Sequence, residues 1–124
     1  MGALSLMGDP WWREGFGPFL PGTVEVPFGD LEALEEVLKK ERTAAVILEP
    51  VQAEAGVVLP PEGYLAGAGE LCRQHGALFV LDEVQTGLHR TGPFLAAHRY
   101  GVRPDMVVLA KALSGGLVPV GAVL

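Results

Sequence analysis

The chain has 124 residues, of which 49% are hydrophobic and 19% are charged, a composition typical of one folded domain and not of a disordered segment. Its net charge of −6 excludes the basic surfaces with which proteins bind nucleic acid or anionic membranes. Cys72 is the only cysteine, so no intramolecular disulfide forms, and no apolar run has the length of a membrane span. We therefore expect a cytoplasmic protein without nucleic-acid or membrane partners.

The first half of the chain predicts an arm, two strands and a helix. Residues 1–22 have no clear period and carry both tryptophans, which predicts an irregular surface arm. Residues 23–27 are rich in β-forming side chains and predict a short strand. Asp30 is placed to cap a helix whose apolar side chains recur at helical spacing through Leu38. The unbroken apolar run at 44–48 predicts a strand that is covered on both faces.

The second half continues the alternation. We expect a helix over about 62–74, which Gly76 ends, and a further short helix near 94–100. Three more apolar runs predict strands, at 77–81, 106–110 and 118–124. Strand–helix–strand units of about 30 residues predict an α/β fold, with a mostly parallel sheet and helices on both faces.

Ionisable residues stand where three of the predicted strands end. Glu49, Asp82 and Lys111 follow the runs at 44–48, 77–81 and 106–110. Ligands of open α/β sheets bind beyond the carboxyl ends of the strands, so these side chains mark the expected site. On spacing alone, a plain ion pair between Asp82 and Lys111 explains them better than an active site does.

The sequences around these residues favour an active site over a plain ion pair. The stretches "ILEPVQAEAGV", "LDEVQTGLHRTG" and "LAKALSGGLVPVGAVL" closely resemble the class III aminotransferases, and among these the ornithine and acetylornithine aminotransferases. The resemblance extends back through "REGFGPFLPG" and covers essentially all 124 residues. It implies the large domain of the fold type I enzymes that depend on pyridoxal 5′-phosphate.

The resemblance also implies a role for several residues. Asp82 would pair with the pyridine nitrogen of pyridoxal phosphate, which lets the ring act as an electron sink. Lys111 would form the Schiff base with the cofactor and then serve as general base and acid. Val84 would pack against one face of the ring, and Gln85 would hydrogen-bond the phenolic oxygen. Glu54 matches a family glutamate that shields a substrate-binding arginine, although a solvated loop acid explains it equally well.

The remaining ionisable residues have simpler explanations. Glu49 and Glu83 are expected to be structural, as acceptors for loop amides or for the first amides of a helix. His89 stands where relatives carry a small residue and is expected to lie exposed in a loop. None of the histidines has the spacing of a metal ligand, so no metal site is expected.

The resemblance covers only the middle of the family's large domain. The phosphate-gripping turn and helix that precede this region in the family, and the C-terminal small domain that follows it, are outside these 124 residues. We expect transamination between an amino donor, such as ornithine or acetylornithine, and a 2-oxo acid such as 2-oxoglutarate. We also expect the 124-residue chain alone to be inactive and to form a homo-oligomer.

Two other classes of function stay open. The chain could be a non-catalytic α/β remnant that self-associates and whose strand-end charges merely pair. A small doubly wound ligand-binding module has less support, because no phosphate-binding turn is present. Within the family, aminomutases and a decarboxylase share Asp82, Gln85 and Lys111, and the sequence does not separate them from aminotransferases.

Overall fold

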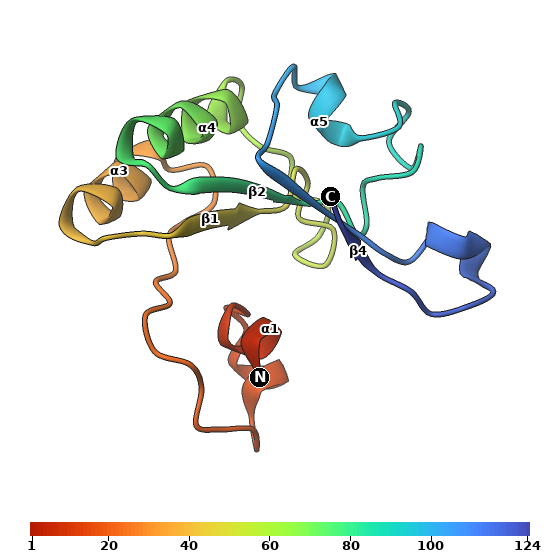
Figure 1. Cartoon of the computed structure of the whole chain (residues 1–124), viewed down its shortest axis with the longest axis horizontal. Coiled ribbons are helices and arrows are strands. Elements are labelled where there is room, and N and C mark those ends of the chain that lie inside the picture. The colour runs from red at the N-terminus through yellow and green to blue at the C-terminus, as the bar shows by residue number, and fades with distance from the viewer.

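A four-stranded sheet with helices beside it organises the chain in a computed structural model that describes residues 1–124 (Figure 1). The strand order is β1-β2-β3-β4, with β1, β2 and β3 parallel and β4 antiparallel to β3. The elements are α1 (Gly2–Ser5), α2 (Pro10–Arg13), α3 (Leu31–Lys40), β1 (Ala45–Leu48), α4 (Tyr64–His75), β2 (Leu78–Asp82), α5 (Ala96–Arg99), β3 (Met106–Leu109), the 3-10 helix η1 (Leu113–Gly116) and β4 (Ala122–Val123).

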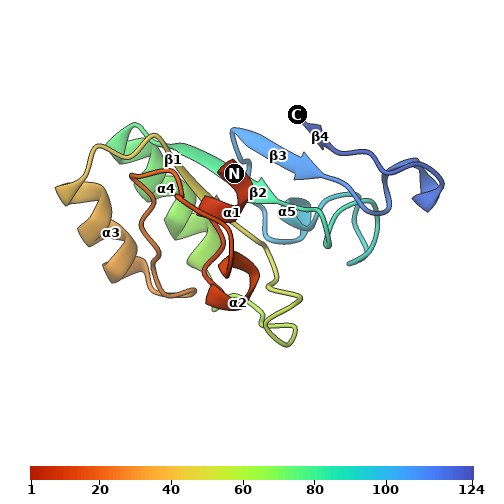
Figure 2. The same cartoon turned by 90° about the horizontal axis from the view of Figure 1, so that it is seen from below.

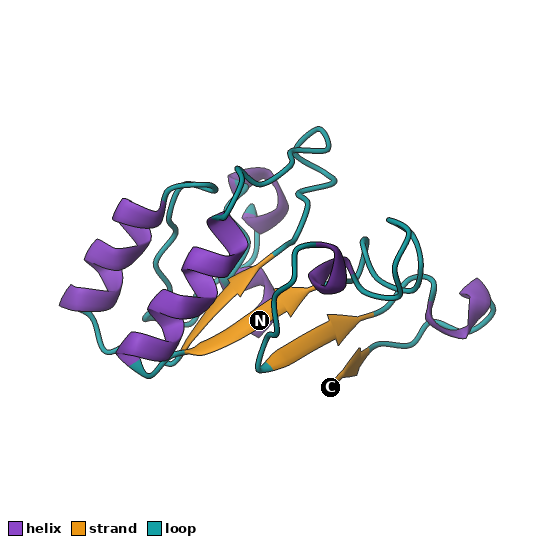
Figure 3. Ribbon diagram, turned by 90° about the horizontal axis from the view of Figure 1, so that it is seen from above, coloured by secondary structure: helices purple, strands orange, loops and turns teal.

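The predicted fold class is confirmed, because the sheet is mostly parallel and helices lie on both sides of it. In Figure 1, α3, α4 and α5 lie above the sheet, and α1 and α2 lie below it. Figure 2, from below, brings the N-terminal arm in front of the strands, and Figure 3, from above, brings α3 and α4 in front. The arm does not cover its side of the sheet, since Ile47 and Leu78 remain 44% and 47% exposed there.

Local sequence signals explain the two long helices. The Asp30 carboxylate accepts a hydrogen bond from the Ala33 amide at 2.9 Å and so caps α3 as predicted. Helix α4 begins at Tyr64, two residues later than expected, and ends at Gly76, whose left-handed φ of +70° suits a residue without a β-carbon.

The hydrophobic core lies between α3, α4 and the upper face of the sheet. Phe79 and Leu81 of β2 point into it, and the ring of Phe79 packs so closely on α4 that a β-carbon on Gly69 would come within 3.2 Å of it. This packing holds β2 and its C-terminal end in place below the helices. The buried members of the core are Leu34, Leu38, Val46, Tyr64, Leu65, Ala68, Cys72, Ala77, Phe79, Leu81 and Ala97.

Two predicted strands are wrong in whole or in part. Residues 23–27 form no strand, because no other segment offers them a ladder of hydrogen bonds and they run alone between the arm and α3. The strand predicted at 118–124 is reduced to Ala122–Val123, since Pro119 lacks an amide proton and residues 114–118 close a loop on themselves. The arm at 1–22 also contains α1 and α2, which the sequence did not indicate.

The thiol of Cys72 can be used to test whether water enters the hydrophobic core. Burial, with a smaller effect of the Asp105 carboxylate, raises the pKa of the Cys72 thiol from 9.0 to about 11. Below pH 9 the thiol is protonated in both the folded and the unfolded chain, and between pH 9 and 11 only the unfolded chain ionises it. The free energy of unfolding should therefore fall by about 2 kcal/mol by pH 11 on account of this group.

Urea unfolding at pH 8 and at pH 11 would measure that loss in the wild-type chain and in Cys72→Ala. The variant should lose about 2 kcal/mol less than the wild type over this range, because it has no thiol to ionise. Equal losses would mean that water reaches the thiol in the folded chain.

Candidate active site

The three strand-end residues lie at one edge of the sheet, as predicted. Leu48 pairs with Leu81, and Asp82 pairs with Val108, so the chain leaves all three parallel strands at the same level. The arrowheads of the three parallel strands in Figure 3 point to this edge. Asp82 is the last residue of β2, while Lys111 follows the end of β3 by two residues. The sheet therefore brings a carboxylate and an amine to adjacent positions of the edge where ligands of such folds bind.

One carboxylate oxygen of Asp82 accepts a hydrogen bond and the other does not. Its Oδ1 accepts a hydrogen bond from the Val84 amide at 3.0 Å, which closes a tight turn directly after β2. Its Oδ2 has no hydrogen-bond donor in the structure. The side chain is half-buried, so a partner that bears an N–H group and reaches this edge would meet an oriented acceptor.

Glu54 joins Gln85 to Lys111. The Gln85 Nε2 donates to Glu54 Oε1 at 2.9 Å, and the Lys111 Nζ lies 4.0 Å from the same oxygen. The side chains of Lys111 and Glu54 are 46% and 85% exposed, so this ion pair is worth about 0–1 kcal/mol and holds the amine only weakly. Lys111 thus pairs with Glu54 and not with Asp82. The simple ion pair between Asp82 and Lys111 that the strand ends suggested is not formed.

The backbone at Lys111 takes a conformation that no local sequence pattern indicated. Its φ is +49°, in the left-handed region that residues with a β-carbon rarely adopt. Such conformations are held at a cost of about 1–3 kcal/mol and gather at functional sites. Here the turn sends the chain from the end of β3 into η1 and leaves the lysine side chain at the sheet edge.

Glu83 is buried at the same edge, with 1% of its surface exposed. Its carboxylate accepts hydrogen bonds from the Ala96 and Ala97 amides, at the start of α5, and from the Thr86 hydroxyl. The structural role predicted for it, as an acceptor for the first amides of a helix, is confirmed. His89 is exposed in the following loop, as predicted, and its Nδ1 lies 3.0 Å from the Gly92 carbonyl oxygen.

Glu49 is half-buried close to the charges of the site. Burial raises the pKa of its carboxyl group above 4.5, and the Asp82 carboxylate raises it further, while the Ala53 amide and the Lys111 ammonium lower it. Because the folded-state pKa is raised, the stabilisation from Glu49 is present below pH 4.5 and is lost as the pH rises through the folded-state pKa.

Glu49→Gln should accordingly become more stable relative to the wild type between pH 4 and pH 7, since glutamine has no proton to lose. Thermal unfolding of both chains across this range would measure the difference. A difference that stays constant with pH would show that the folded chain does not disfavour the Glu49 carboxylate.

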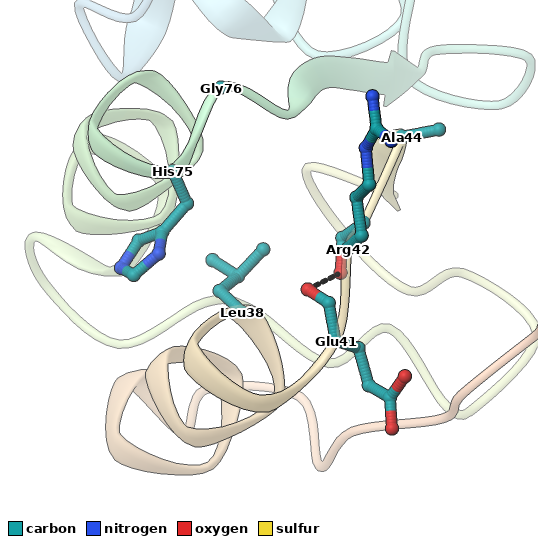
Figure 4. Close-up of a pocket in the computed structure, with 7 residues that line it drawn as sticks. Leu38, Glu41, Arg42, Ala44, His75 and Gly76 are labelled. Atoms are coloured by element: carbon teal, nitrogen blue, oxygen red, sulfur yellow. Dashed lines mark hydrogen bonds between the residues drawn. The ribbon is translucent and has the colours of Figure 1, made fainter.

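A hollow of about 350 Å³ lies away from this edge (Figure 4). Its lining comes from the end of α3, the segment before β1 and the end of α4, so it opens at the amino ends of the strands. The strand-end residues named above do not line it. The lining residues are Leu38, Glu41, Arg42, Thr43, Ala44, His75 and Gly76.

A mostly parallel sheet with helices is the fold that this chain shares with pyridoxal-phosphate-dependent aminotransferases of fold type I. The family model described as "Aminotransferase class-III" matches residues 1–124. The chain therefore belongs to the class III aminotransferases, a family of pyridoxal-phosphate-dependent enzymes, and the resemblance seen in the sequence is confirmed.

Ornithine aminotransferases are among the relatives of known activity. The chain is 54% identical over 124 residues to the mitochondrial ornithine aminotransferase of Rattus norvegicus, and 51% identical over 123 residues to the ornithine aminotransferase of Bacillus cereus. These matches cover 100% and 99% of this chain but only 28% and 31% of the two relatives. The chain thus spans less than a third of the length of the curated relatives that it matches.

Solved structures of ornithine and acetylornithine aminotransferases also match this chain. The ornithine aminotransferase of Toxoplasma gondii, which has partial occupancy of pyridoxal phosphate at its active site, superposes with a TM-score of 0.93 at 46% identity over 99% of this chain and 29% of its own. The acetylornithine aminotransferase of Elizabethkingia anophelis gives a TM-score of 0.81 at 53% identity over 85% of this chain and 28% of its own.

Proposed function

We propose that this chain supplies the lysine-bearing part of the active site of a pyridoxal-phosphate-dependent aminotransferase. The amino donor would be ornithine, acetylornithine or a similar ω-amino compound, and the acceptor a 2-oxo acid such as 2-oxoglutarate. The observation that carries the proposal is the common edge of β2 and β3, where Asp82, Gln85 and Lys111 come together in a chain that matches the family throughout.

The donor set fits the cofactor. The free Oδ2 of Asp82 can accept a hydrogen bond from a protonated ring nitrogen. Gln85 Nε2 carries two N–H groups, so it can keep its bond to Glu54 and still donate to a phenolic oxygen. Val84 offers an apolar side chain next to Asp82 for one face of the ring. When bound, pyridoxal phosphate supplies an electron sink for a carbanion at the substrate carbon.

Lys111 would act twice in this scheme. Its Nζ would be the nucleophile that holds pyridoxal phosphate, and the same nitrogen would move a proton at the substrate carbon. The weak pair with Glu54 leaves the amine available for both tasks. Glu54 would belong to the substrate site, where it fixes the Gln85 amide and can pair with a cationic group that enters beside Lys111.

We further propose that the phosphate-binding region and the small domain of the complete enzyme lie outside these 124 residues, so that the chain alone does not turn over. The exposure of the Lys111 and Glu54 side chains supports this, because transamination needs a cofactor held in place and shielded from water. Sustained conversion of ornithine and 2-oxoglutarate by the isolated chain, supplied with pyridoxal phosphate, would refute this part of the proposal.

A cofactor titration tests the site itself. Pyridoxal phosphate is added to the chain, binding is followed by visible absorbance, and borohydride then fixes the cofactor to lysine for peptide mapping. Saturable binding that maps to Lys111 would support the proposal. Labelling spread evenly over Lys39, Lys40 and Lys111 would contradict it, since Lys39 and Lys40 are exposed lysines of α3.

The exposed apolar surface favours a second candidate, a remnant that self-associates without catalysis. The uncovered side of the sheet and the N-terminal arm carry large hydrophobic side chains, and such patches mark contact surfaces. We propose that the chain forms a homo-oligomer through them in either case. Sedimentation velocity that finds a monomer at micromolar concentration would refute this. The exposed hydrophobic side chains of this surface include those of Trp11, Trp12, Phe16, Ile47, Leu78 and Val123.

A location in the cytoplasm is also part of the proposal. Cys72, the single cysteine, is a free and buried thiol, as is usual in a reducing compartment. No helix of the structure is long and apolar enough to cross a membrane. Fractionation of cells, followed by detection of the chain with an antibody, would test the location.

A further inference from the structure

We propose that Glu83 is a positioning residue of this site: a buried carboxylate that sets the directions of Asp82 and Gln85. The inference rests on the proposed function, because it assigns to Glu83 the task of holding two residues that would bind the cofactor. Glu83 stands between them in the chain and is 1% exposed, so its own carboxylate does not face the site edge.

The carboxylate of Glu83 accepts three hydrogen bonds inside the fold. Its Oε2 accepts from the Thr86 hydroxyl at 2.8 Å and from the Ala96 amide at 2.8 Å, and its Oε1 accepts from the Ala97 amide at 2.7 Å. Both oxygens thus face a backbone N–H, which can only donate. A side-chain amide in this place would turn an N–H group onto one of these backbone amides in either orientation, whereas the acid accepts from both.

The backbone of Glu83 is held as firmly as its side chain. Its amide donates to the Val108 carbonyl at 2.9 Å, which completes the last pair between β2 and β3, that of Asp82 with Val108. Its carbonyl accepts from the Gly87 amide at 2.9 Å, and a β-carbon on Gly87 would come within 2.9 Å of that oxygen. Residues 83–87 therefore form a tight turn that is anchored to β3 on one side and to α5 on the other.

The two residues beside this anchor are those that meet the site. The turn gives Asp82 its hydrogen bond from the Val84 amide and carries Gln85 to its contact with Glu54. Loss of the anchor would release both bonds, even where the core under α4 stays intact. An acid that served only the stability of the core would leave these two contacts unchanged relative to the rest of the chain.

The test compares Glu83→Gln with Glu62→Gln, which makes the same chemical change at an exposed residue before α4. Amide hydrogen exchange is followed by NMR in the chain without cofactor. In Glu83→Gln we expect exchange at the Val84, Ala96 and Ala97 amides to rise about tenfold, the equivalent of one lost hydrogen bond, relative to the amides of β1 and α4. Glu62→Gln should match the wild type. Equal acceleration of all amides would overturn the proposal.

Thr86→Val covers the case in which Glu83→Gln does not fold. It removes one hydrogen bond to Glu83 and keeps both backbone amides in place. We expect Val84 exchange to rise about threefold, a fraction of one hydrogen bond. Val84 exchange at the wild-type rate would overturn the proposal.

Pyridoxal-phosphate affinity supplies the readout that a structural role would not change. The dissociation constant should rise about tenfold in Glu83→Gln, the equivalent of one hydrogen bond, while the amides of β1 and α4 keep their protection. An unchanged constant, together with accelerated Val84 exchange, would overturn the link to the cofactor. A wild-type chain that binds no pyridoxal phosphate would refute the proposed function, while the exchange results would still decide whether Glu83 orders the turn.

Discussion

Lys111→Ala is expected to abolish the attachment of pyridoxal phosphate at a single site and to weaken its binding at least about a hundredfold. A covalent link to one lysine cannot be replaced by the noncovalent contacts that remain at the edge, which are hydrogen bonds worth about 1 kcal/mol each. In this chain the Lys111 Nζ is held only by a 4.0 Å pair with an exposed carboxylate, so it is accessible to the cofactor. Borohydride reduction and peptide mapping of the cofactor-treated variant would measure the loss.

Lys40→Ala is the matched control for this prediction. Lys40 is exposed on α3 and pairs with Glu36 at 2.9 Å. It has the same amine as Lys111 but does not belong to the proposed site. Lys40→Ala should bind cofactor as the wild type does. If both variants lost the same small fraction of label, lysine reactivity alone would explain the binding, and the proposed site would fall.

The parallel strands of the sheet could be predicted because their signal is local. The runs at 44–48, 77–81 and 106–110 are apolar without alternation, and a strand of the structure overlaps each of them. The helix after Asp30 was equally clear, since a cap and an apolar stripe lie within one segment. The strand predicted at 23–27 was wrong because a strand also needs a neighbouring strand to pair with, and no local pattern shows whether such a strand is near.

The site could be predicted to the extent that it follows from the sheet. Parallel strands end at one edge, so the closeness of Asp82 and Lys111 to that edge could be read from the positions of the strand ends. The contact of Gln85 with Glu54 joins residues 31 positions apart and depends on the paths of two loops. The left-handed backbone at Lys111 and the three donors around Glu83 likewise arise from how these loops fold back, which strand and helix patterns do not encode.

Leu81→Ala is expected to lower the free energy of unfolding by about 4 kcal/mol, toward the upper end for leucine truncations, because the side chain is 0% exposed and lies in the core under α4. Only 21 of the 124 residues are buried, so total stability should lie near the lower end of the usual range of about 5–15 kcal/mol. The variant should therefore be close to unfolded in water. Urea unfolding followed by circular dichroism would measure this.

Leu59→Ala removes the same atoms from a side chain that is 65% exposed, and should change the free energy of unfolding by less than about 0.5 kcal/mol. Similar effects of the two substitutions would mean that the helices do not pack on β2 in solution as they do in the structure. The comparison bears on the site as well as on the core. Leu81 directly precedes Asp82, so the packing that buries this leucine also fixes where the strand ends and where its carboxylate stands.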